Sequence, residues 1–508
     1  MFASVASGVV EGVEGNPVSV EVHVSRGLPS YNLVGMPDAA CRESRDRVRA
    51  AILSSGFRWP SESRVTINLA PAGLRKHGSC LDLPIALGIL AASEQLRVGD
   101  VARVGAVGEL GLDGSLRAIT GLVCVVGAVS TEGIIVPTVG SEEAAAVRPG
   151  AVYAFATLAD VVAWLRGQAG VEPVAPPQHG LADGWRRKGV GDLADVRGQP
   201  LARWALEIAA AGGHHLLMSG PPGSGKTMLA SRLVGVLPPL DAEDARTVTR
   251  IHSAAGISLP PGGVVRHPPL RSPHHGLSLV ALVGGGTAAM RPGEISCAHA
   301  GVLFLDELGE FSPVGLDALR QPLEEGVIRI ARASRSVSMP ARFQLVAAMN
   351  PCPCGEGAQP GACRCSDAAR ARYSRRLSGP LLDRFDLRIG VQPPSVETLL
   401  DATKEESSAA VAARVGGVRK LARERGFRSN AEVPSNRLDE VAPLTSKARS
   451  ALRAALVDDR LTGRGLTRVR RVARTVADLS GEELVDVETI SAVLAMRSFP
   501  AHALAVSS

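Results

Sequence analysis

The sequence predicts a multidomain α/β protein with an N-terminal α/β domain, a central α/β domain and a C-terminal helical domain. In residues 1–165, short runs typical of strands alternate with helical stretches. Around residue 220, an apolar strand runs directly into a glycine-rich phosphate-binding motif. From residue 395 onward, apolar residues recur at helical spacing.

Length and composition agree with three folded units. The chain has 508 residues, enough for about three domains, and its 45% hydrophobic and 21% charged residues are typical of a globular protein. A net charge of +6 permits an acidic partner such as nucleic acid without indicating one. No signal peptide and no long apolar run is visible, so we expect a cytoplasmic protein that does not bind membranes.

In the N-terminal domain, residues 1–165, we expect strands at 18–24, 64–70 and 133–137. Residues 44–56 and 81–93 read as helices. Glycine- and proline-rich residues follow at 166–190 and predict a linker. We then expect the central α/β domain at 191–394 and the helical domain at 395–508.

The central domain carries a P-loop, Gly-x4-Gly-Lys-Thr, between an apolar strand and an amphipathic helix. Its glycines let successive backbone N–H groups face phosphate, and the following helix adds favourable dipole charge. Lys226 would neutralise the β- and γ-phosphates of ATP, and the Thr227 hydroxyl would hold Mg²⁺. The predicted nucleotide-binding residues are Gly220, Pro221, Pro222, Gly223, Ser224, Gly225, Lys226 and Thr227.

Two further apolar strands deliver polar side chains that hydrolysis needs. Val302 to Leu305 end in Asp306 and Glu307, where a buried strand would bring one carboxylate to Mg²⁺ and another to the attacking water. The strand FQLVAAMN ends in Asn350, whose amide could orient that water. Taken alone, such an asparagine is more often a turn residue, and an acidic pair can be an exposed turn after a core strand.

These residues resemble the AAA+ ATPases, and longer segments resemble their magnesium-chelatase-like branch, specifically the ComM/YifB family. The segments are RSPHHGLSLVALVGGGTAAMRPGEISCAHAGVLFLDELGEF, NPCPCG and LSGPLLDRFDL. The resemblance implies that Asn350 is the sensor-1 residue and that Arg384 is an arginine finger supplied by a neighbouring subunit. It implies that Arg468 is the sensor-2 residue, with Arg471 as the competing candidate, and that the active species is a ring, most commonly a hexamer.

The stretch between Lys226 and Asp306 is longer than a minimal crossover needs. It includes His274-His275 and the glycine run 284–286. We interpret it as a glycine-rich apolar hairpin that projects into the ring pore and touches a polymer. A loop packed on the subunit surface is the alternative.

Four cysteines lie within fourteen residues, at Cys352, Cys354, Cys363 and Cys365. Glycine and proline between the two C-x-C pairs would let the pairs fold back onto each other. Four thiolates at about 2.3 Å around Zn²⁺ form a closed structural site, so we expect a zinc ion that pins this loop between Asn350 and Arg384, both of which we expect to flank the ATP site. The C-x-C spacing is tighter than the usual knuckle, and disulfides are the alternative, which a reducing cytosol disfavours.

The segments RKHGSCLDLPIALGIL and GELGLDGSLRAITGLV resemble the Lon protease domain, of the ribosomal-S5-like α/β class. Lon-type proteases use a serine nucleophile and a lysine that accepts its proton. Here Cys80 stands at the nucleophile's position and Val123 at the lysine's, while Lys76 lies beside Cys80 in sequence. Because an aliphatic side chain cannot take a proton, we expect no proteolysis and a role in ring assembly or substrate engagement.

Three functions remain open. The ComM-like family implies an ATP-driven motor that performs branch migration of single-stranded or branched DNA in natural transformation and recombination. A metal-chelatase motor subunit that drives ion insertion into a porphyrin, and a protein remodeller or regulator, share the same ATPase core. Arginine-rich helical segments at 419–428 and 464–474 favour the DNA motor weakly, because amphipathic helices often carry such faces.

Overall fold

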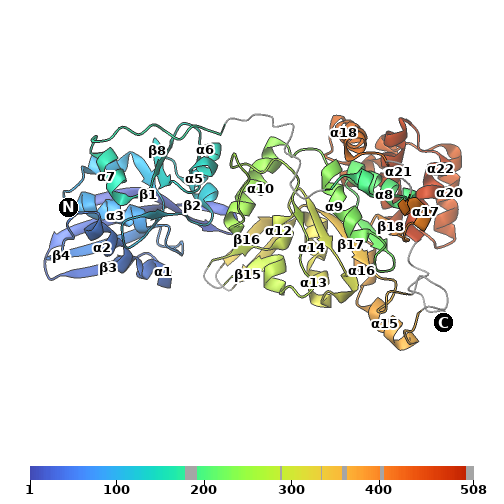
Figure 1. Ribbon diagram of the computed structural model, residues 1–508, viewed down its shortest axis with the longest axis horizontal. Helices are drawn as coiled ribbons and strands as arrows, with labels where there is room; N and C mark the ends of the chain where they lie inside the picture. Colours follow the sequence, from blue (N-terminus) through green and yellow to red (C-terminus); the bar gives the residue numbers. More distant parts are fainter. Residues whose placement is uncertain (178–190, 287–288, 333–334, 357–362, 401–404, 499–508) are drawn as a thin grey trace.

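The computed structural model describes residues 1–177, 191–286, 289–332, 335–356, 363–400 and 405–498. The predicted linker at 166–190 lies largely outside these described residues. Figure 1 shows three parts in a row along the long axis, with the N-terminal part at one end, the central sheet in the middle and the C-terminal helices at the other end. Within the described residues, no helix combines the length and hydrophobicity needed to cross a membrane.

The N-terminal part is built on a mixed seven-stranded sheet, in the order β3-β4-β2-β1-β5-β8-β9. All eleven residues of helix α3 (Asp82–Ala92) are buried: ten are apolar, and the carboxylate of Asp82 pairs with Arg47 at 2.7 Å. The strands of this sheet are β1 (Phe2–Glu11), β2 (Glu14–Arg26), β3 (Ser30–Val34), β4 (Ser63–Ala70), β5 (Val104–Ala106), β8 (Gly133–Pro137) and β9 (Val152–Phe155). A separate antiparallel pair is formed by β6 (Glu109–Leu110) and β7 (Leu116–Arg117). The other helices are α1 (Ala39–Arg42), α2 (Ser44–Ser54), α4 (Val98–Ala102), α5 (Leu122–Ala128), α6 (Ser141–Val147) and α7 (Leu158–Leu165).

The central part contains a five-stranded sheet in which every neighbouring pair is parallel, in the order β11-β14-β17-β10-β18. Its three middle strands are buried throughout, because helices cover a parallel sheet on both faces. The strands are β10 (Leu216–Ser219), β11 (Leu270–Arg271), β14 (Val302–Leu305), β17 (Gln344–Met349) and β18 (Leu387–Gly390). The helices are α8 (Pro200–Gly212), α9 (Lys226–Val236), α10 (Ala242–Ala255), α12 (Glu294–Cys297), α13 (Pro313–Ala318), α14 (Arg320–Glu325), α15 (Asp367–Arg375) and α16 (Gly379–Leu382).

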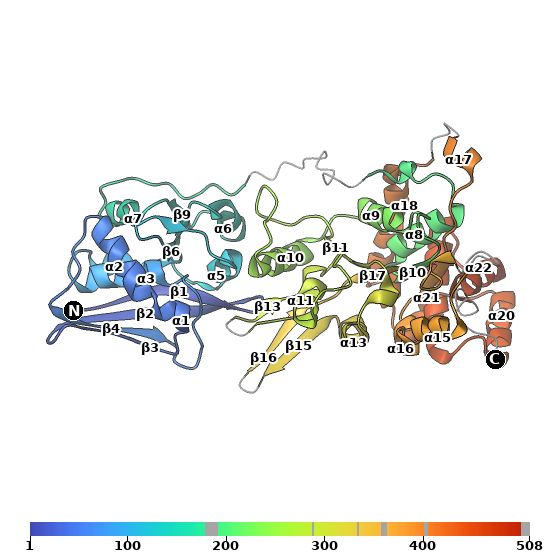
Figure 2. The ribbon, with the colours of Figure 1, turned by 60° about the horizontal axis from the view of Figure 1, so that its bottom comes forward.

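Two antiparallel hairpins are inserted around this sheet. The first follows α11 (Leu279–Val283) and pairs β12 (Gly284–Gly285) with β13 (Arg291–Pro292), in the segment where the sequence predicted a glycine-rich hairpin. The second pairs β15 (Val327–Arg332) with β16 (Arg335–Pro340) and was not anticipated. Figure 2 shows β15 and β16 extending away from the sheet.

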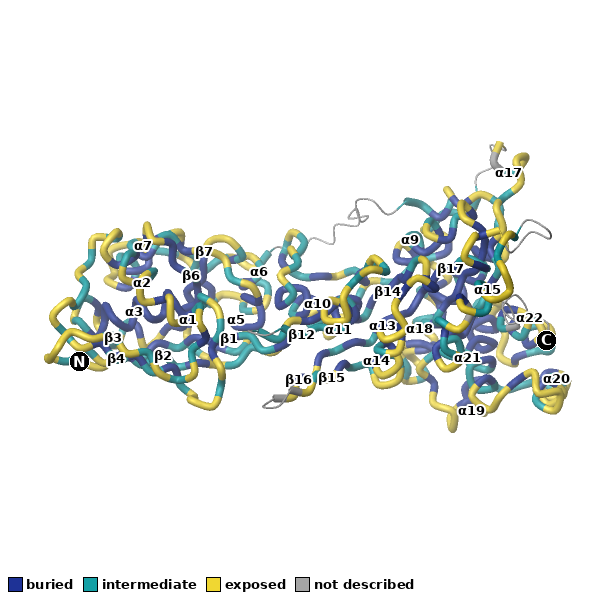
Figure 3. Tube along the Cα trace, turned by 90° about the horizontal axis from the view of Figure 1, so that it is seen from below, coloured by how far each residue is buried: buried dark blue, intermediate teal, exposed yellow. Residues whose placement is uncertain are grey.

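The C-terminal part is helical, as the sequence predicted, and it shares one hydrophobic core with α8, α9 and β18. Figure 3 shows its buried segments continuing those of the central part. The helices are α17 (Val396–Leu400), α18 (Ser408–Glu424), α19 (Leu438–Val441), α20 (Ser446–Val457), α21 (Gly463–Ser480) and α22 (Val487–Ser498). A bidentate ion pair, with both N–O distances 2.7 Å, joins Arg425 to the buried Asp478.

The N-terminal part docks directly on the central part. The turn between β1 and β2 reaches the first inserted hairpin, where the Gly12 N–H donates to the Met290 carbonyl at 3.0 Å (Figure 2). The Gly121 N–H donates to the Ser253 carbonyl on α10 at 2.9 Å. The Arg250 side chain, also on α10, forms an ion pair with the first residue of β2. The two parts therefore meet through backbone bonds as well as side chains.

Candidate functional site

The P-loop follows β10 and opens helix α9, as the sequence predicted. Gly223 and Gly225 have φ values of +75° and +86°, which most other residues avoid. The Gln199 amide, which sequence reasoning missed, donates to the Ser224 carbonyl at 2.7 Å and ties the loop to the chain before α8. A glutamine in an irregular segment gives no motif signal, so only the fold could identify it.

Lys226 is nearly buried at the centre of the P-loop. Its Nζ donates to the carbonyl oxygens of Gly220 and Pro221, both at 2.8 Å, and lies 3.4 Å from the Asn350 Oδ1. Burial lowers the pKa of Lys226, while the nearby Asp306 carboxylate raises it. These oxygens hold the ammonium at the mouth of the loop, where the phosphates of a nucleotide would replace them as its partners.

The predicted Mg²⁺ ligands are brought together at the same edge of the sheet. The Thr227 hydroxyl donates to the Asp306 carboxylate at 2.7 Å, although 79 residues separate them. A hydroxyl and a carboxylate at the phosphate end of a P-loop are oxygen ligands of the kind Mg²⁺ prefers. The residues present therefore fit a Mg²⁺–nucleotide complex.

Glu307 follows in a left-handed conformation, with φ +52°, that turns the chain sharply after β14. Its carboxylate is half exposed and lies 3.2 Å from the Nδ1 of His275. The His275 ring also meets the edge of Phe311 at 6.4 Å between centroids. The sequence places His275 in the inserted segment but does not predict this contact, because no local pattern connects the loop after β11 with the end of β14.

Asn350 ends β17 beside Lys226, the neighbourhood that the sequence predicted. The Tyr373 side chain on α15 hydrogen-bonds the Asn350 backbone, and burial raises the pKa of Tyr373 to about 12. The tyrosine ring packs on Gly309, just after the Asp306–Glu307 pair. One buried tyrosine thus braces the ends of two neighbouring strands, a contact with no sequence signature.

The predicted arginines lie elsewhere. Arg468 Nη1 donates to the Arg384 carbonyl at 2.8 Å and to Asp386 Oδ1 at 2.7 Å. Asp386 accepts the His215 N–H at 3.0 Å, at the amino end of β10 and β18. The P-loop follows the carboxyl end of β10, a strand of four residues or about 13 Å away. Among the described residues, no hydrogen bond joins either arginine to the chain's own P-loop.

The electrostatics of this second region are strongly positive. The Arg384 guanidinium pairs with Glu324 on α14. Burial and the neighbouring guanidinium groups of Arg468, Arg464 and Arg320 lower its pKa. Burial alone would raise the pKa of Asp386, but Arg468 and two histidines outweigh it and hold that pKa at about 2. Arg471, the competing sensor-2 candidate, instead donates to the Val433 carbonyl at 2.7 Å within the helical part.

The four loop cysteines converge, although residues 357–362 between the two pairs lie outside the described part. Their four sulfur atoms all lie within 4.8 Å of one another. The Cys352 sulfur is 3.3 Å from that of Cys354 and 3.7 Å from that of Cys363. Sulfur ligands at about 2.3 Å in a tetrahedron lie about 3.8 Å apart, whereas a disulfide is about 2.0 Å long. The residues present fit a metal centre with four cysteine ligands.

The N-terminal part offers no dyad at the positions that sequence reasoning examined. Val123 is buried in α5, and its side chain carries no proton acceptor. Burial raises the pKa of Cys80 to about 12, which disfavours the nucleophilic thiolate. Lys76 is fully buried, and its Nζ donates to the Pro71 carbonyl.

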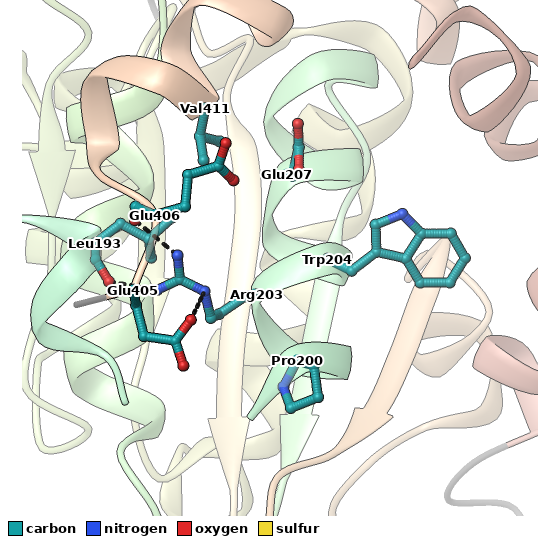
Figure 4. A pocket seen from close by; sticks show the side chains of 8 residues that line it. All are labelled: Leu193, Pro200, Arg203, Trp204, Glu207, Glu405, Glu406 and Val411. Carbon is teal, nitrogen blue, oxygen red and sulfur yellow. Dashed lines mark hydrogen bonds and ion pairs between the residues drawn. The ribbon is translucent and has the colours of Figure 1, made fainter. Parts of the chain in front are cut away.

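One further cavity, of about 230 Å³, lies where the chain enters the C-terminal helices (Figure 4). Arg203 crosses it, lying 3.9 Å from Glu405 and donating to the Val196 carbonyl at 3.0 Å. None of the P-loop residues lines this cavity. The charged groups that line this cavity are already paired with one another or with Arg414. These pairs join the central and C-terminal parts, and we do not assign the cavity as a second site.

Comparison with known proteins gives matches along most of the chain. Residues 192–399 match the family model described as magnesium chelatase, subunit ChlI; residues 20–139 match subunit ChlI of Mg-chelatase; and residues 405–497 match the magnesium chelatase, subunit ChlI C-terminal model. The chain is 43% identical over 505 residues to the competence protein ComM of Haemophilus influenzae, covering 98% of this chain and 97% of the relative.

Two other relatives match over similar lengths. The protein YifB of Escherichia coli is 42% identical over 494 residues, covering 96% of this chain and 95% of its own. The protein Rv2897c of Mycobacterium tuberculosis is 43% identical over 498 residues, covering 97% of each chain. The similarity therefore spans all three parts of the fold and is not confined to the P-loop region.

Proposed function

Because the chain belongs to the ComM/YifB family of magnesium-chelatase-like AAA+ ATPases, we propose that it is a ring-forming motor that moves branched DNA. Branch migration during recombination or natural transformation is the activity we propose. The name of the Haemophilus relative, a competence protein, supports the biological setting. The observation that carries the proposal is the separation of the two arginines from the chain's own P-loop.

We assign the hydrolytic roles to the residues that follow the carboxyl ends of β10, β14 and β17. Bound ATP with Mg²⁺ supplies the phosphoanhydride bond whose hydrolysis drives the motor. Lys226 would neutralise the phosphate oxygens, and Thr227 and Asp306, which hydrogen-bond each other here, would hold the metal ion. Glu307 accepts the proton of the attacking water, which the Asn350 amide orients. The Lys226–Asn350 distance of 3.4 Å supports their action on the same phosphate.

Arg384 and Arg468 support the proposal of a ring. A guanidinium that stabilises charge on the γ-phosphate must reach it, and neither side chain bonds the P-loop of its own chain among the described residues. We propose that both act on the nucleotide of the next subunit, in a hexamer. The hydrogen bond from Arg468 to the Arg384 carbonyl supports a shared task, because it fixes the two arginines relative to each other.

The two inserted hairpins are the proposed DNA contacts. In β15 and β16, Ile328 and Met339 are buried at the base of the hairpin, whereas the Arg329 side chain, which pairs with Glu325 of α14, is 55% exposed. The sequence adds further arginines toward its tip. Arginines on a projecting hairpin suit a phosphate backbone, whose neutralisation dominates affinity for DNA. The glycine run 284–286 on the other hairpin is the proposed pore contact.

The remaining assignments concern the cysteines and the N-terminal part. We propose that the four cysteines hold a structural Zn²⁺, which the spacing of their sulfur atoms supports. We propose that the N-terminal part is a Lon-like domain without proteolytic activity that serves ring assembly or substrate engagement. Its backbone bonds to Met290 and Ser253 support mechanical coupling to the motor.

The test is ATP hydrolysis by purified protein with single-stranded, duplex and four-way-junction DNA. We expect single-stranded or junction DNA to raise the rate, and binding to weaken steeply with salt. A fluorescent four-way junction should be resolved in the presence of ATP and not with a non-hydrolysable analogue. Stimulation by a porphyrin-binding partner and by no DNA would replace this proposal with the chelatase alternative.

A further inference from the structure

The cysteine loop touches the P-loop directly. Gly355, between the two halves of the cysteine cluster, has φ +83° and lies against Pro222. A Cβ on Gly355 would lie 2.7 Å from Pro222 Cδ and 2.8 Å from Cγ, closer than real Cβ contacts come. The backbone of the loop therefore rests on the proline ring, a contact that glycine alone allows.

The segment from Met349 to Gly355 contacts the P-loop at both of its ends. The Met349 carbonyl at the end of β17 accepts the Gly220 N–H at 3.2 Å, where the P-loop begins. From Met349 the chain runs through Asn350 to the cysteines and returns at Gly355 onto Pro222. Pro222 is next to Pro221, whose carbonyl holds Lys226. The cysteine loop thus packs against the P-loop at Pro222.

The shape of this loop depends on the cysteines. The Gly355 N–H donates to the Cys352 carbonyl at 3.0 Å, which makes a tight turn between the first two sulfur ligands. The four convergent sulfur atoms join the two ends of the loop. A bound metal ion would fix that turn, and its loss would remove the cross-link that joins the two halves of the loop.

We propose that metal bound by the four cysteines sets the nucleotide affinity of the P-loop, by pressing Gly355 against Pro222. The metal-loaded loop holds the P-loop in its phosphate-binding shape, and the metal-free loop lets it relax. The proposed ligand is a thiophilic divalent ion that prefers tetrahedral coordination, and Zn²⁺ is the first candidate. The inference rests on the proposed ATPase function of this site and adds a metal requirement to it.

Two variants separate metal binding from the contact. Cys354→Ser removes one ligand, and we expect it to lose zinc and to bind a fluorescent ADP analogue about ten- to a hundredfold more weakly, the scale of an ångström-sized misplacement in a site. Gly355→Ala keeps all four ligands but pushes against Pro222. We expect it to retain one zinc per chain and to lose nucleotide affinity nonetheless.

Gly426→Ala is the matched control for Gly355→Ala. Gly426 has φ +88°, so alanine meets the same backbone strain, but no atom lies within 4 Å of its Cβ position. We expect wild-type zinc content and wild-type ADP affinity. A difference between the two alanine variants therefore reports the contact with Pro222 and not the strain of a left-handed alanine.

The measurements are zinc content by elemental analysis, the dissociation constant for the ADP analogue and thermal unfolding. Wild-type affinity in folded, zinc-free Cys354→Ser protein, or in Gly355→Ala protein, would overturn the inference and leave the ATPase proposal intact. Should Cys354→Ser not fold, Gly355→Ala still decides. Lys226→Ala is the reference for a failed nucleotide site; equal affinity of wild type and Lys226→Ala would instead remove the proposed function itself.

Discussion

The Arg468 side chain donates a hydrogen bond to the Arg384 carbonyl at 2.8 Å, linking two residues 84 positions apart. The same guanidinium pairs with the buried Asp386 at 2.7 Å. Two arginines from different parts of the fold are thus fixed side by side near the amino ends of the parallel strands. The P-loop lies at the carboxyl ends of these strands. Within the described residues, Arg384 pairs with Glu324 and Arg468 with Asp386, and neither guanidinium bonds the P-loop of its own chain.

Mixing two inactive variants tests whether the site is shared. Arg384→Ala should lower kcat for ATP by about 10³- to 10⁵-fold, as expected for a missing arginine finger. Lys226→Ala should lose nucleotide binding. Co-assembly of the two should restore part of the turnover, because some interfaces then combine an intact P-loop with an intact arginine. Arg103→Ala, at an exposed position of the N-terminal part, is the control. A fully active single chain at dilutions that prevent assembly would contradict the shared site.

Glu307→Gln should bind ATP normally and lose turnover. The amide keeps the shape of the side chain but cannot accept the proton of the attacking water. Binding of a fluorescent nucleotide and release of phosphate, measured on the same preparation, check the two halves of this prediction. Glu424→Gln changes an exposed carboxylate of α18 and should alter neither. Normal hydrolysis by Glu307→Gln would remove Glu307 from the proposed mechanism.

His275→Ala should change kcat by up to about fivefold with little change in KM for ATP, since a half-exposed polar contact contributes about 1 kcal/mol or less. The reason is that His275 contacts Glu307 and not the phosphate-binding residues, at an Nδ1–Oε2 distance of 3.2 Å. We expect a higher rate without DNA and weaker stimulation by DNA, because the loop after β11 then no longer holds Glu307. His274→Ala, at the neighbouring ring, which is tilted by 34° against that of His275, is the comparison. Equal effects of both substitutions would argue against a specific contact.

Arg329→Ala should weaken binding of DNA to a similar extent for every sequence. An arginine that meets phosphate carries no base information, so its loss should lower the slope of log K against log salt by about one. The Arg329 side chain is 55% exposed on β15. Anisotropy titrations with labelled single-stranded DNA at several salt concentrations measure this slope. A slope equal to that of wild type would exclude Arg329 from the phosphate contacts.

Acidification should destabilise the protein through its buried histidines. Burial lowers the pKa of His214 and of His215 from 6.5 to about 4 in the folded state. Unfolded chains therefore bind more protons between these values, so stability is complete above pH 6.5 and falls as the pH drops toward 4. Thermal unfolding at pH 7, 6 and 5 should show this loss. His214→Gln should flatten the dependence, and the exposed His23→Gln should leave it unchanged.

Local sequence determined much of this architecture. The strands ending at Ser219, Leu305 and Met349 were predictable because each is a run of apolar residues that ends in polar ones. The P-loop was predictable because its glycines, lysine and threonine act within eight consecutive residues. The helical character of the C-terminal part followed from spacing that repeats within a few turns. The catalytic roles of these residues stay predictions.

Tertiary structure alone decided the contacts between distant segments. The hairpin β15–β16, the His275–Glu307 pair, the Arg384–Arg468 pair and the seat of Gly355 on Pro222 have no local signature. Periodicity reports which face of a segment is buried, but not which other segment buries it. That choice depends on strand order and on how the parts pack, since residues dozens of positions apart meet only when the whole chain has folded.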